Sequence, residues 1–310
     1  CLLSGVPLMR ATSLLQIVML CVCVSSLALT AAGQQPRQDR RTLREPVYRV
    51  AQAPRQAQAA AATAEHPLAE VAAKAEELLG GMQRNVRDYS ATLVKRERID
   101  GELLDYQYIN CKIRNERTNG RGEVVTPFSV YMNFAAPDEM KGREVIYVKG
   151  QNDDKLIAHD GGTGLIAAIK AAVTVNLDPT APLAMKGNKY PITDVGMENL
   201  MVKLISVAKA DMQRGEVDVK TFKGAKINGR VCTCLQSVHP TPREHFRYHI
   251  ARIYVDDELQ LPIRYESYDW PSREGEQPPL LEEYTYLNLK LNNGFTDADF
   301  DQANDSYNFN

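Results

Sequence analysis

The chain has no marked excess of charge of one sign. Its 37 Lys and Arg residues nearly balance 39 Asp and Glu residues, so the formal net charge of the 310-residue chain is −2. With 44% hydrophobic and 25% charged residues, the composition excludes a collagen-like, a wholly disordered or a multi-span membrane protein. The positive charge is enriched in residues 34–64, which leaves a mildly acidic remainder. Because nucleic acids need a concentrated basic face, we predict no nucleic-acid partner.

The short motifs that identify a reaction or a metal are missing as well. The glycines of residues 161–164 lack both the Gly-Lys-Ser/Thr ending of a phosphate-binding loop and the full spacing of a dinucleotide-binding loop. No Gly-x-Ser-x-Gly, Cys-x-x-Cys or His-Glu-x-x-His occurs anywhere. We therefore predict no catalytic residue, no cofactor and no metal site.

Two constellations leave alternatives open. Cys232 and Cys234 precede three closely spaced histidines at 239, 245 and 249, whose donor atoms suit a transition metal. Ordinary exposed histidines remain the interpretation that we favour. His159 followed by Asp160 fits a catalytic base with its orienting carboxylate, which would indicate a hydrolase. The remaining acidic clusters are interpreted as solvated, and they comprise Glu282, Glu283, Asp297, Asp299 and Asp301.

A single long uncharged run occurs, near the start of the chain. No charged residue lies between Arg10 and Arg37, and Leu14–Leu29 has the length of a signal-peptide core. The small residues that follow fit a cleavage site near Ala32. A membrane anchor is the alternative, but these 16 residues are short for a span of about 20. We predict that residues 1–33 are a cleaved signal peptide and that the protein is extracytoplasmic, either periplasmic or secreted.

Cysteine is scarce, and cleavage would remove three of the six residues. Cys111, Cys232 and Cys234 would remain. On a strand, Cys232 and Cys234 share a face but lie too far apart to pair easily. One disulfide with one free thiol, or three thiols, both stay open, and we favour three half-buried thiols.

Residues 34–64 are rich in Gln, Arg, Pro and Ala and have few apolar side chains. Such a segment buries too little surface to offset the entropy of ordering, so we predict a disordered basic linker. Its six Arg residues would allow proximity to an anionic membrane or cell-wall polymer. A simple solvated spacer is the interpretation that we favour.

From residue 65 onward the pattern predicts a single α+β domain, residues 65–310. Apolar residues recur at three- and four-residue steps, which predicts a helix over Leu68–Val86. A second helix is predicted over Asp194–Arg214, with Asp194 as its cap. The apolar segment Leu165–Val173 predicts a further helix, or a plug, in the core.

The other segments alternate between apolar and polar side chains. This pattern predicts about nine or ten strands, including a long one over residues 103–117, joined by short turns as antiparallel hairpins. Strands and helices do not alternate regularly, which argues against a doubly wound fold. Two strands present the clearest apolar faces, formed by Phe128, Val130, Met132 and Phe134 in one and by Leu287, Leu289 and Leu291 in the other. Tyr284 and Tyr286 are predicted on the face opposite those leucines.

Several segments resemble an exported bacterial family, the domain of unknown function numbered 1571. They are Tyr89–Arg98, Met132–Phe134, Gly142–Gly150, Tyr190–Thr193 and, above all, Tyr284–Asn292 running to Phe300. The resemblance covers about residues 65–310. That family is in turn similar to the periplasmic lipoprotein carriers LolA and LolB. The resemblance therefore implies a curled antiparallel sheet, an incomplete β-barrel, closed over an apolar cavity by about three helices.

A curled sheet that is too wide to fill its own interior leaves a hollow lined by inward side chains. The candidate lining residues are Phe128, Val130, Met132, Phe134, Leu165, Ile169, Leu287, Leu289 and Leu291. We therefore hypothesise non-enzymatic binding of a lipid, an acyl chain or a lipoprotein outside the cytoplasm. The alternative is a structural or interaction protein of the cell envelope with a filled interior, and a hydrolase is the third hypothesis.

Overall fold

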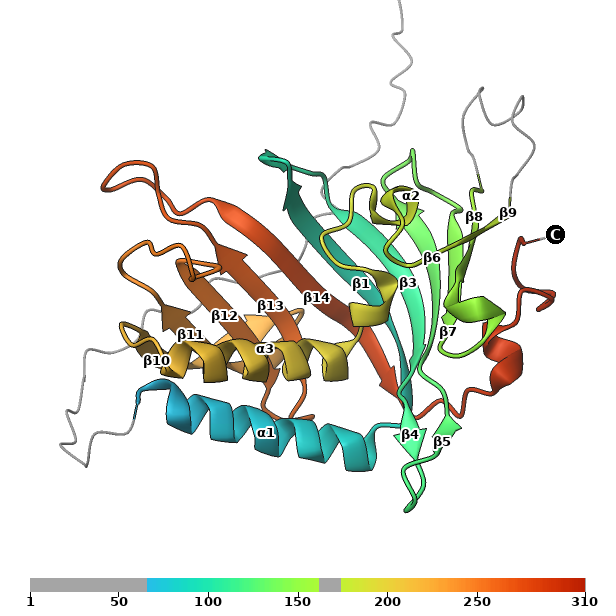
Figure 1. Ribbon diagram of the computed structural model, residues 1–310, viewed down its shortest axis with the longest axis horizontal. Coiled ribbons are helices and arrows are strands. Elements are labelled where there is room, and N and C mark those ends of the chain that lie inside the picture. Colours follow the sequence, from blue (N-terminus) through green and yellow to red (C-terminus); the bar gives the residue numbers. More distant parts are fainter. Residues whose placement is uncertain (1–65, 162–173, 310) are drawn as a thin grey trace, which may run out of the picture. The chain divides into compact units, whose positions relative to one another are not determined.

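A computed structural model describes residues 66–161 and 174–309, all of which belong to the unit Glu45–Asn310. In the described residues β4 and β5 pair as a separate two-stranded sheet, and the other twelve strands form one antiparallel sheet. Its order is β10-β11-β12-β13-β14-β1-β3-β6-β7-β8-β9, with β2 paired to β1 (Figure 1). The two end strands do not pair with each other, so the sheet is an incomplete barrel. The predicted signal peptide (1–33), the linker (34–64) and the segment 165–173 lie outside the described residues.

The described residues form three α-helices, namely α1 (Leu68–Asn85), α2 (Pro182–Met185) and α3 (Met197–Met212). The strands before the undescribed segment are β1 (Asp88–Ile99), β2 (Glu102–Leu103), β3 (Gln107–Arg114), β4 (Arg117–Thr118), β5 (Val124–Thr126), β6 (Ser129–Ala136), β7 (Glu144–Val148) and β8 (Leu156–His159). Those after it are β9 (Thr174–Leu177), β10 (Asp218–Ile227), β11 (Arg230–Val238), β12 (Ile250–Asp256), β13 (Pro262–Tyr268) and β14 (Leu280–Leu291). The 3₁₀ turns are η2 (Asn152–Asp154), η3 (Ile192–Asp194) and η4 (Asp297–Phe300). The predicted fold class, a curled antiparallel sheet with three helices, is confirmed.

Helices α1 and α3 lie side by side across the half of the sheet that contains β10–β14 (Figure 1). Each buries one stripe of side chains at helical spacing, formed by Leu68, Ala72, Leu78 and Met82 in α1 and by Met197, Met201 and Ile205 in α3. These stripes pack the helices onto the sheet, and the predicted helix over Leu68–Val86 is confirmed. Among the described residues, no helix combines the length and the apolarity needed to cross a membrane.

Helix α3 begins after Gly196, so the prediction that Asp194 caps it is wrong. Asp194 instead ends η3. The N–H of Met197 donates to the hydroxyl of the fully buried Tyr89 in β1 at 2.9 Å. Gly196 has φ +113°, and a Cβ there would lie 3.3 Å from the same hydroxyl, which is why a glycine fits. The first turn of α3 is thereby fixed against the centre of the sheet.

Two edge strands, β9 and β10, were not predicted. In β10 the register shifts between Phe222 and Ala225, around Gly224 at φ +76°, and this shift breaks the alternation of apolar and polar residues. β9 is only four residues long. The long strand predicted over residues 103–117 is divided, because residues 104–106 are not part of the sheet. The predicted and observed strands differ because these strands are irregular or lie at the edge of the sheet, and not because of their amino-acid composition.

The prediction that Leu287, Leu289 and Leu291 share one face of the sheet is wrong, because β14 contains a bulge. The register with β1 shifts by one extra residue of β14 near Asn288, which has φ +53°. Such a bulge sends the residues beyond it to the other face. Tyr286 therefore packs in the main core before the bulge, and Leu289 and Leu291 pack against the same core after it. Leu287 lies on the face opposite Tyr286.

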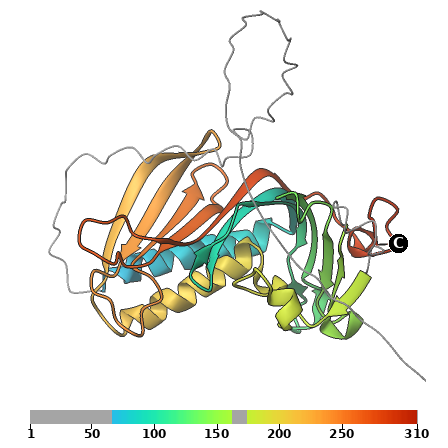
Figure 2. The same ribbon diagram turned by 90° about the horizontal axis from the view of Figure 1, so that it is seen from above.

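We call the face of the sheet that carries Leu93, Ile109 and Met132 the inner face. Figure 2 shows the sheet curling from β10–β12 (orange) to β6–β9 (green), with α1 and α3 on the inner side. The main core lies between this face and the helices. On the outer face the C-terminal segment covers β6 and β7, where the rings of Tyr131 and Tyr307 stack with centroids 3.9 Å apart.

Candidate functional site

A cavity of about 1300 Å³ lies between the inner face of the sheet and the segment that runs from α2 through η3 to α3. Pockets for small molecules are typically roughly 300–1,000 Å³. The space is therefore larger than a compact metabolite requires, and its walls differ in chemistry from one part to the next.

One part of the cavity is apolar. It is formed by alternate residues of β1, β3 and β6–β9 together with α2 and η3, because side chains two apart on a strand point to the same face. We call this surface the apolar wall, and it comprises Leu93, Ile109, Met132, Phe134, Met140, Val145, Leu156, Ala158, Val175, Leu177, Leu183, Ala184 and Ile192. Glu139, Arg143 and Asp160 also line the cavity, and the last two pair with each other at 3.4 Å. The apolar side chains themselves form a surface that suits a hydrocarbon ligand.

The other part is a cluster of charges that we call the polar node, formed by Lys95, Glu97, Glu282 and Tyr284. Glu97 of β1 and Glu282 of β14 lie directly opposite each other, and each residue is at most 4% exposed. Opposed like charges destabilise a sheet unless neighbours offset them. Lys95 Nζ lies 3.0 Å from Glu97 and also donates to Asn188 at 2.6 Å. The Tyr284 hydroxyl donates to Glu97 at 2.5 Å.

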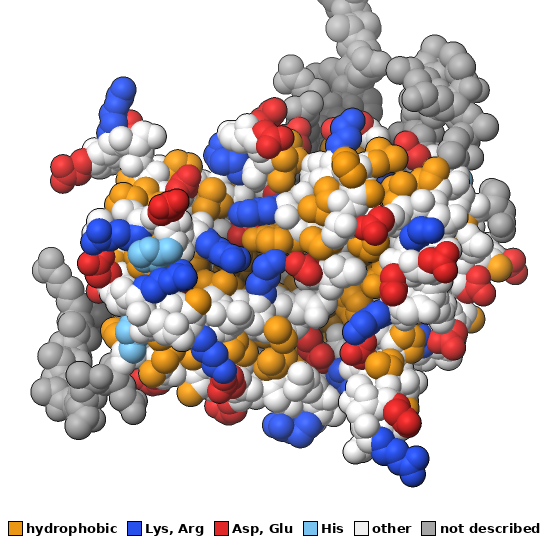
Figure 3. Space-filling view, viewed as in Figure 1, with side chains coloured by type: hydrophobic (Ala, Val, Ile, Leu, Met, Phe, Trp, Pro, Cys, Tyr) orange, Lys and Arg blue, Asp and Glu red, His pale blue; other side chains and the backbone are white. Residues whose placement is uncertain are grey.

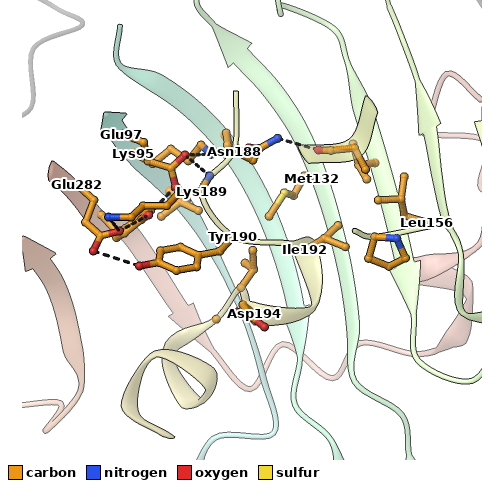
Figure 4. Close-up of a pocket in the computed structure, with 18 of the residues that line it drawn as sticks. Lys95, Glu97, Met132, Leu156, Asn188, Lys189, Tyr190, Ile192, Asp194 and Glu282 are labelled. Carbon is orange, nitrogen blue, oxygen red and sulfur yellow. Dashed lines mark hydrogen bonds and ion pairs between the residues drawn. The ribbon is translucent and has the colours of Figure 1, made fainter. Parts of the chain in front are cut away.

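The polar node also fastens residues 188–190 over the sheet (Figure 4). The backbone N–H of Lys189 donates to Glu97 at 3.1 Å, and its Nζ lies 3.1 Å from Glu282. The Tyr190 hydroxyl donates to Glu282 at 3.3 Å. The two carboxylates thus hold one wall of the cavity in place as well as lining it.

The tyrosines of this region are stable hydrogen-bond donors. Burial raises the pKa of Tyr284 well above its ordinary value, and the negative charges of Glu282 and Glu97 raise it further. Burial and Glu282 likewise raise the pKa of Tyr190. Both phenols therefore stay protonated near neutral pH, which suits them to binding rather than to nucleophilic chemistry.

The structure distributes the predicted lining residues among several places. Met132 and Phe134 lie in the apolar wall. Phe128 and Val130 are buried in the main core, outside the cavity lining. Leu287, Leu289 and Leu291 are likewise outside it. The predicted candidates Leu165 and Ile169 lie outside the described residues.

Sequence reasoning missed the polar node. Glu282 and Glu283 were interpreted as solvated, which is wrong, because the two residues are 4% and 5% exposed. Asp299 likewise pairs with Lys112 at 3.0 Å. One signal was present: Glu282 has the same parity in its strand as Tyr284 and Tyr286, which places all three on the inner face.

In the hydrolase alternative, Asp160 would orient His159 as a catalytic base, and the structure does not pair these two residues. His159 is buried, and its Nδ1 lies 2.9 Å from the Thr174 hydroxyl, which itself donates to the Phe309 carbonyl. Asp160 instead pairs with Arg143 at 3.4 Å. The two residues predicted to act together therefore have different partners.

The histidines and cysteines of the metal alternative also have separate surroundings. The interpretation of the histidines as exposed is wrong for His239, which is fully buried against Asp211, with Nε2 3.3 Å from that carboxylate. Cys232 and Cys234, like Cys111, are free buried thiols, and burial raises the pKa of all three to about 12. Across residues 66–161 and 174–309, no three His, Cys, Asp or Glu side chains come together as metal ligands.

Fold and cavity together define an open-barrel protein whose helices close a curled antiparallel sheet over an interior cavity. Residues 86–309 match the family described as "Protein of unknown function (DUF1571)", and the chain belongs to that family. No match was found among curated proteins.

Solved structures of low identity align with most of the chain. A DUF1329 family protein from Desulfovibrio piger is 13% identical over 77% of this chain and 99% of its own, with a TM-score of 0.38. The MucA/MucB complex of Pseudomonas aeruginosa gives 16% identity over 75% of this chain and 61% of the matched chain, with a TM-score of 0.40. A LolA superfamily protein from Nitrosomonas europaea is 10% identical over 73% and 97%, with a TM-score of 0.27.

Proposed function

We propose that this protein binds an acyl chain of a lipid or of a lipidated protein, without catalysing a reaction, and does so outside the cytoplasm. The observation that supports this function best is the cavity of about 1300 Å³ with its apolar wall. Removing hydrocarbon from water against such a wall is favourable by about 25 cal/mol per Å² of apolar surface buried.

The shape of the wall favours a chain over a compact ligand. It extends across β1, β3, β6, β7, β8 and β9, which are consecutive neighbours in the sheet. Adjacent strands lie about 4.8 Å apart, so the wall spans roughly 24 Å along the curve of the sheet. A flexible hydrocarbon chain follows a long curved surface, whereas a compact metabolite contacts only part of it.

The place of action follows from the N-terminal segment. The predicted signal peptide (1–33) would direct the protein across the cytoplasmic membrane, and the predicted basic linker (34–64) would favour proximity to an anionic surface.

The test is uptake of a fluorescent fatty-acyl probe by delipidated protein. Ala158→Trp adds bulk inside the apolar wall, and Val231→Trp introduces the same side chain at a residue of β11 that is 48% exposed and outside the cavity. We expect saturable uptake by the wild type and by Val231→Trp, and an affinity at least about tenfold lower for Ala158→Trp. No saturable uptake, or equal uptake by both variants, would contradict the proposal and favour an interaction protein of the envelope.

A further inference from the structure

Two cations of the cavity lining lie over one aromatic ring beside the polar node, and a third cation, Arg247, lines the same cavity. Lys203 Nζ of α3 lies 3.8 Å from the centroid of the Tyr190 ring, and Lys189 Nζ lies 5.8 Å from it. Arg247, in the loop between β11 and β12, acts electrostatically on the same phenol and opposes the rise in its pKa. We call Lys189, Lys203 and Arg247 the cationic rim. Figure 3 shows Lys and Arg side chains gathered across the middle of this face, bordered by hydrophobic side chains.

Two of the three charges of the cationic rim are already paired. Lys203 Nζ lies 2.8 Å from Asp194, and Lys189 Nζ lies 3.1 Å from Glu282. Arg247 forms no ion pair with any described residue. Lys95 and Glu97 also offset each other, whereas Lys186 of the cavity lining, like Arg247, has no ion pair among the described residues.

The backbone of Arg247 is held in place by its two neighbours, Phe246 and Tyr248, which are both buried. The Phe246 ring stacks on His239 with centroids 3.9 Å apart, and the Tyr248 carbonyl accepts a hydrogen bond from His239 Nδ1 at 3.1 Å. The exposed Arg247 side chain therefore extends from an anchored loop into the cavity lining. A guanidinium in such a position suits bidentate binding of a carboxylate or a phosphate oxygen pair.

We propose that Arg247 binds the singly charged anionic head group of an amphiphile whose acyl chain lies along the apolar wall. This inference rests on the proposed function and specifies its ligand class. A guanidinium binds an oxygen pair that carries one negative charge, as both a fatty-acid carboxylate and a phosphodiester lipid do. The head group would lie between Arg247 and the Tyr190 ring, with Lys189 and Lys203 as neighbouring donors.

The experiment compares three probes with one fluorescent acyl chain: a free carboxylate, a phosphodiester and a neutral methyl ester. Each is titrated into the delipidated wild type and into Arg247→Gln, Arg247→Lys and Arg243→Gln. Arg243 is the matched control, since it lies in the same loop, pairs with Glu216 at 3.0 Å and does not line the cavity.

We expect Arg247→Gln to weaken binding of an anionic probe about tenfold, the loss of a charge-assisted hydrogen bond, and to change the neutral probe less than about twofold. Arg247→Lys should keep most of the affinity, and Arg243→Gln all of it. The anionic probe with the larger loss identifies the head group. Equal changes for charged and neutral probes would overturn this inference alone. Absence of saturable binding by all three probes in the wild type would overturn the proposed function with it.

Discussion

On each face of the sheet, a glutamate of β14 lies opposite a glutamate of a neighbouring strand. On the inner face Glu282 lies opposite Glu97, and on the outer face Glu283 lies opposite Glu266. All four residues are buried. Two glutamates that are adjacent in the sequence are therefore each repelled by a second carboxylate. Different neighbouring groups offset this repulsion on the two faces.

On the outer face, an arginine forms ion pairs with both carboxylates. Arg264 lies 2.7 Å from Glu266 and 2.5 Å from Glu283, and its side chain is 4% exposed. The inner pair is offset by lysines and tyrosines, and the side chain of Lys189 beside Glu282 is 31% exposed and lines the cavity. We infer that the outer network serves stability, whereas the inner one leaves charged groups within reach of a ligand.

The largest expected effect is the loss of the outer cation. Arg264→Met leaves Glu266 and Glu283 buried opposite each other, and breaking a buried ion pair in this way costs about 3–5 kcal/mol. Urea unfolding measures the free energy directly. A loss below about 1 kcal/mol would contradict the structural role of the outer network.

The matched change on the inner face should cost much less. In Lys189→Met, Glu282 keeps its hydrogen bonds from Ser267 at 3.0 Å and from Tyr190 at 3.3 Å. Since the lysine is partly exposed, we expect a loss of about 1 kcal/mol by the same urea measurement. Equal losses for Arg264→Met and Lys189→Met would remove the distinction between the two faces.

Acid should weaken the outer network. Burial acts to raise the pKa of Glu266, but Arg264 and Arg252 outweigh it and hold the pKa below its ordinary value of 4.5. The folded state therefore loses this proton more readily than the unfolded state. The resulting stability is present above the ordinary value and is lost as the pH falls through the folded-state pKa. The free energy of unfolding should fall less steeply with acid in Glu266→Gln than in the wild type, and identical slopes would contradict this cause.

The smallest expected effect concerns the thiols, which serve neither network. Because burial raises the pKa of Cys111, Cys232 and Cys234 to about 12, they should resist alkylation in the native protein and react after denaturation. Peptide mapping by mass spectrometry distinguishes these three from the N-terminal cysteines. Native-state labelling of any of the three would show that its surroundings open.

Periodicity predicted the parts of the fold that depend on local pattern. The stripe of α1 and the alternation of β6 were sufficient to place a helix and to put Met132 and Phe134 on one face of a strand. The bulge at Asn288 could not be predicted in this way, because one residue in a left-handed conformation leaves little trace in the sequence.

The polar node could not be predicted for a different reason. Glu282 and Glu283 are chemically identical, and their burial depends on Lys189 and Arg264, residues distant from them in the chain. Strand pairing brings Arg264 to Glu283, and the segment between α2 and η3 brings Lys189 to Glu282. A single sequence contains no record of either contact. The same holds for Arg247, which lines the cavity together with Tyr190 although the two residues are distant in the chain.

The central claim, that the cavity holds an acyl chain, is tested most directly by mass spectrometry of the organic extract of natively purified protein. The wild type and Val231→Trp should release an acyl-containing molecule in near-stoichiometric amount, and Ala158→Trp should release much less. An extract without such a molecule from the wild type, or equal amounts from all three proteins, would contradict the claim.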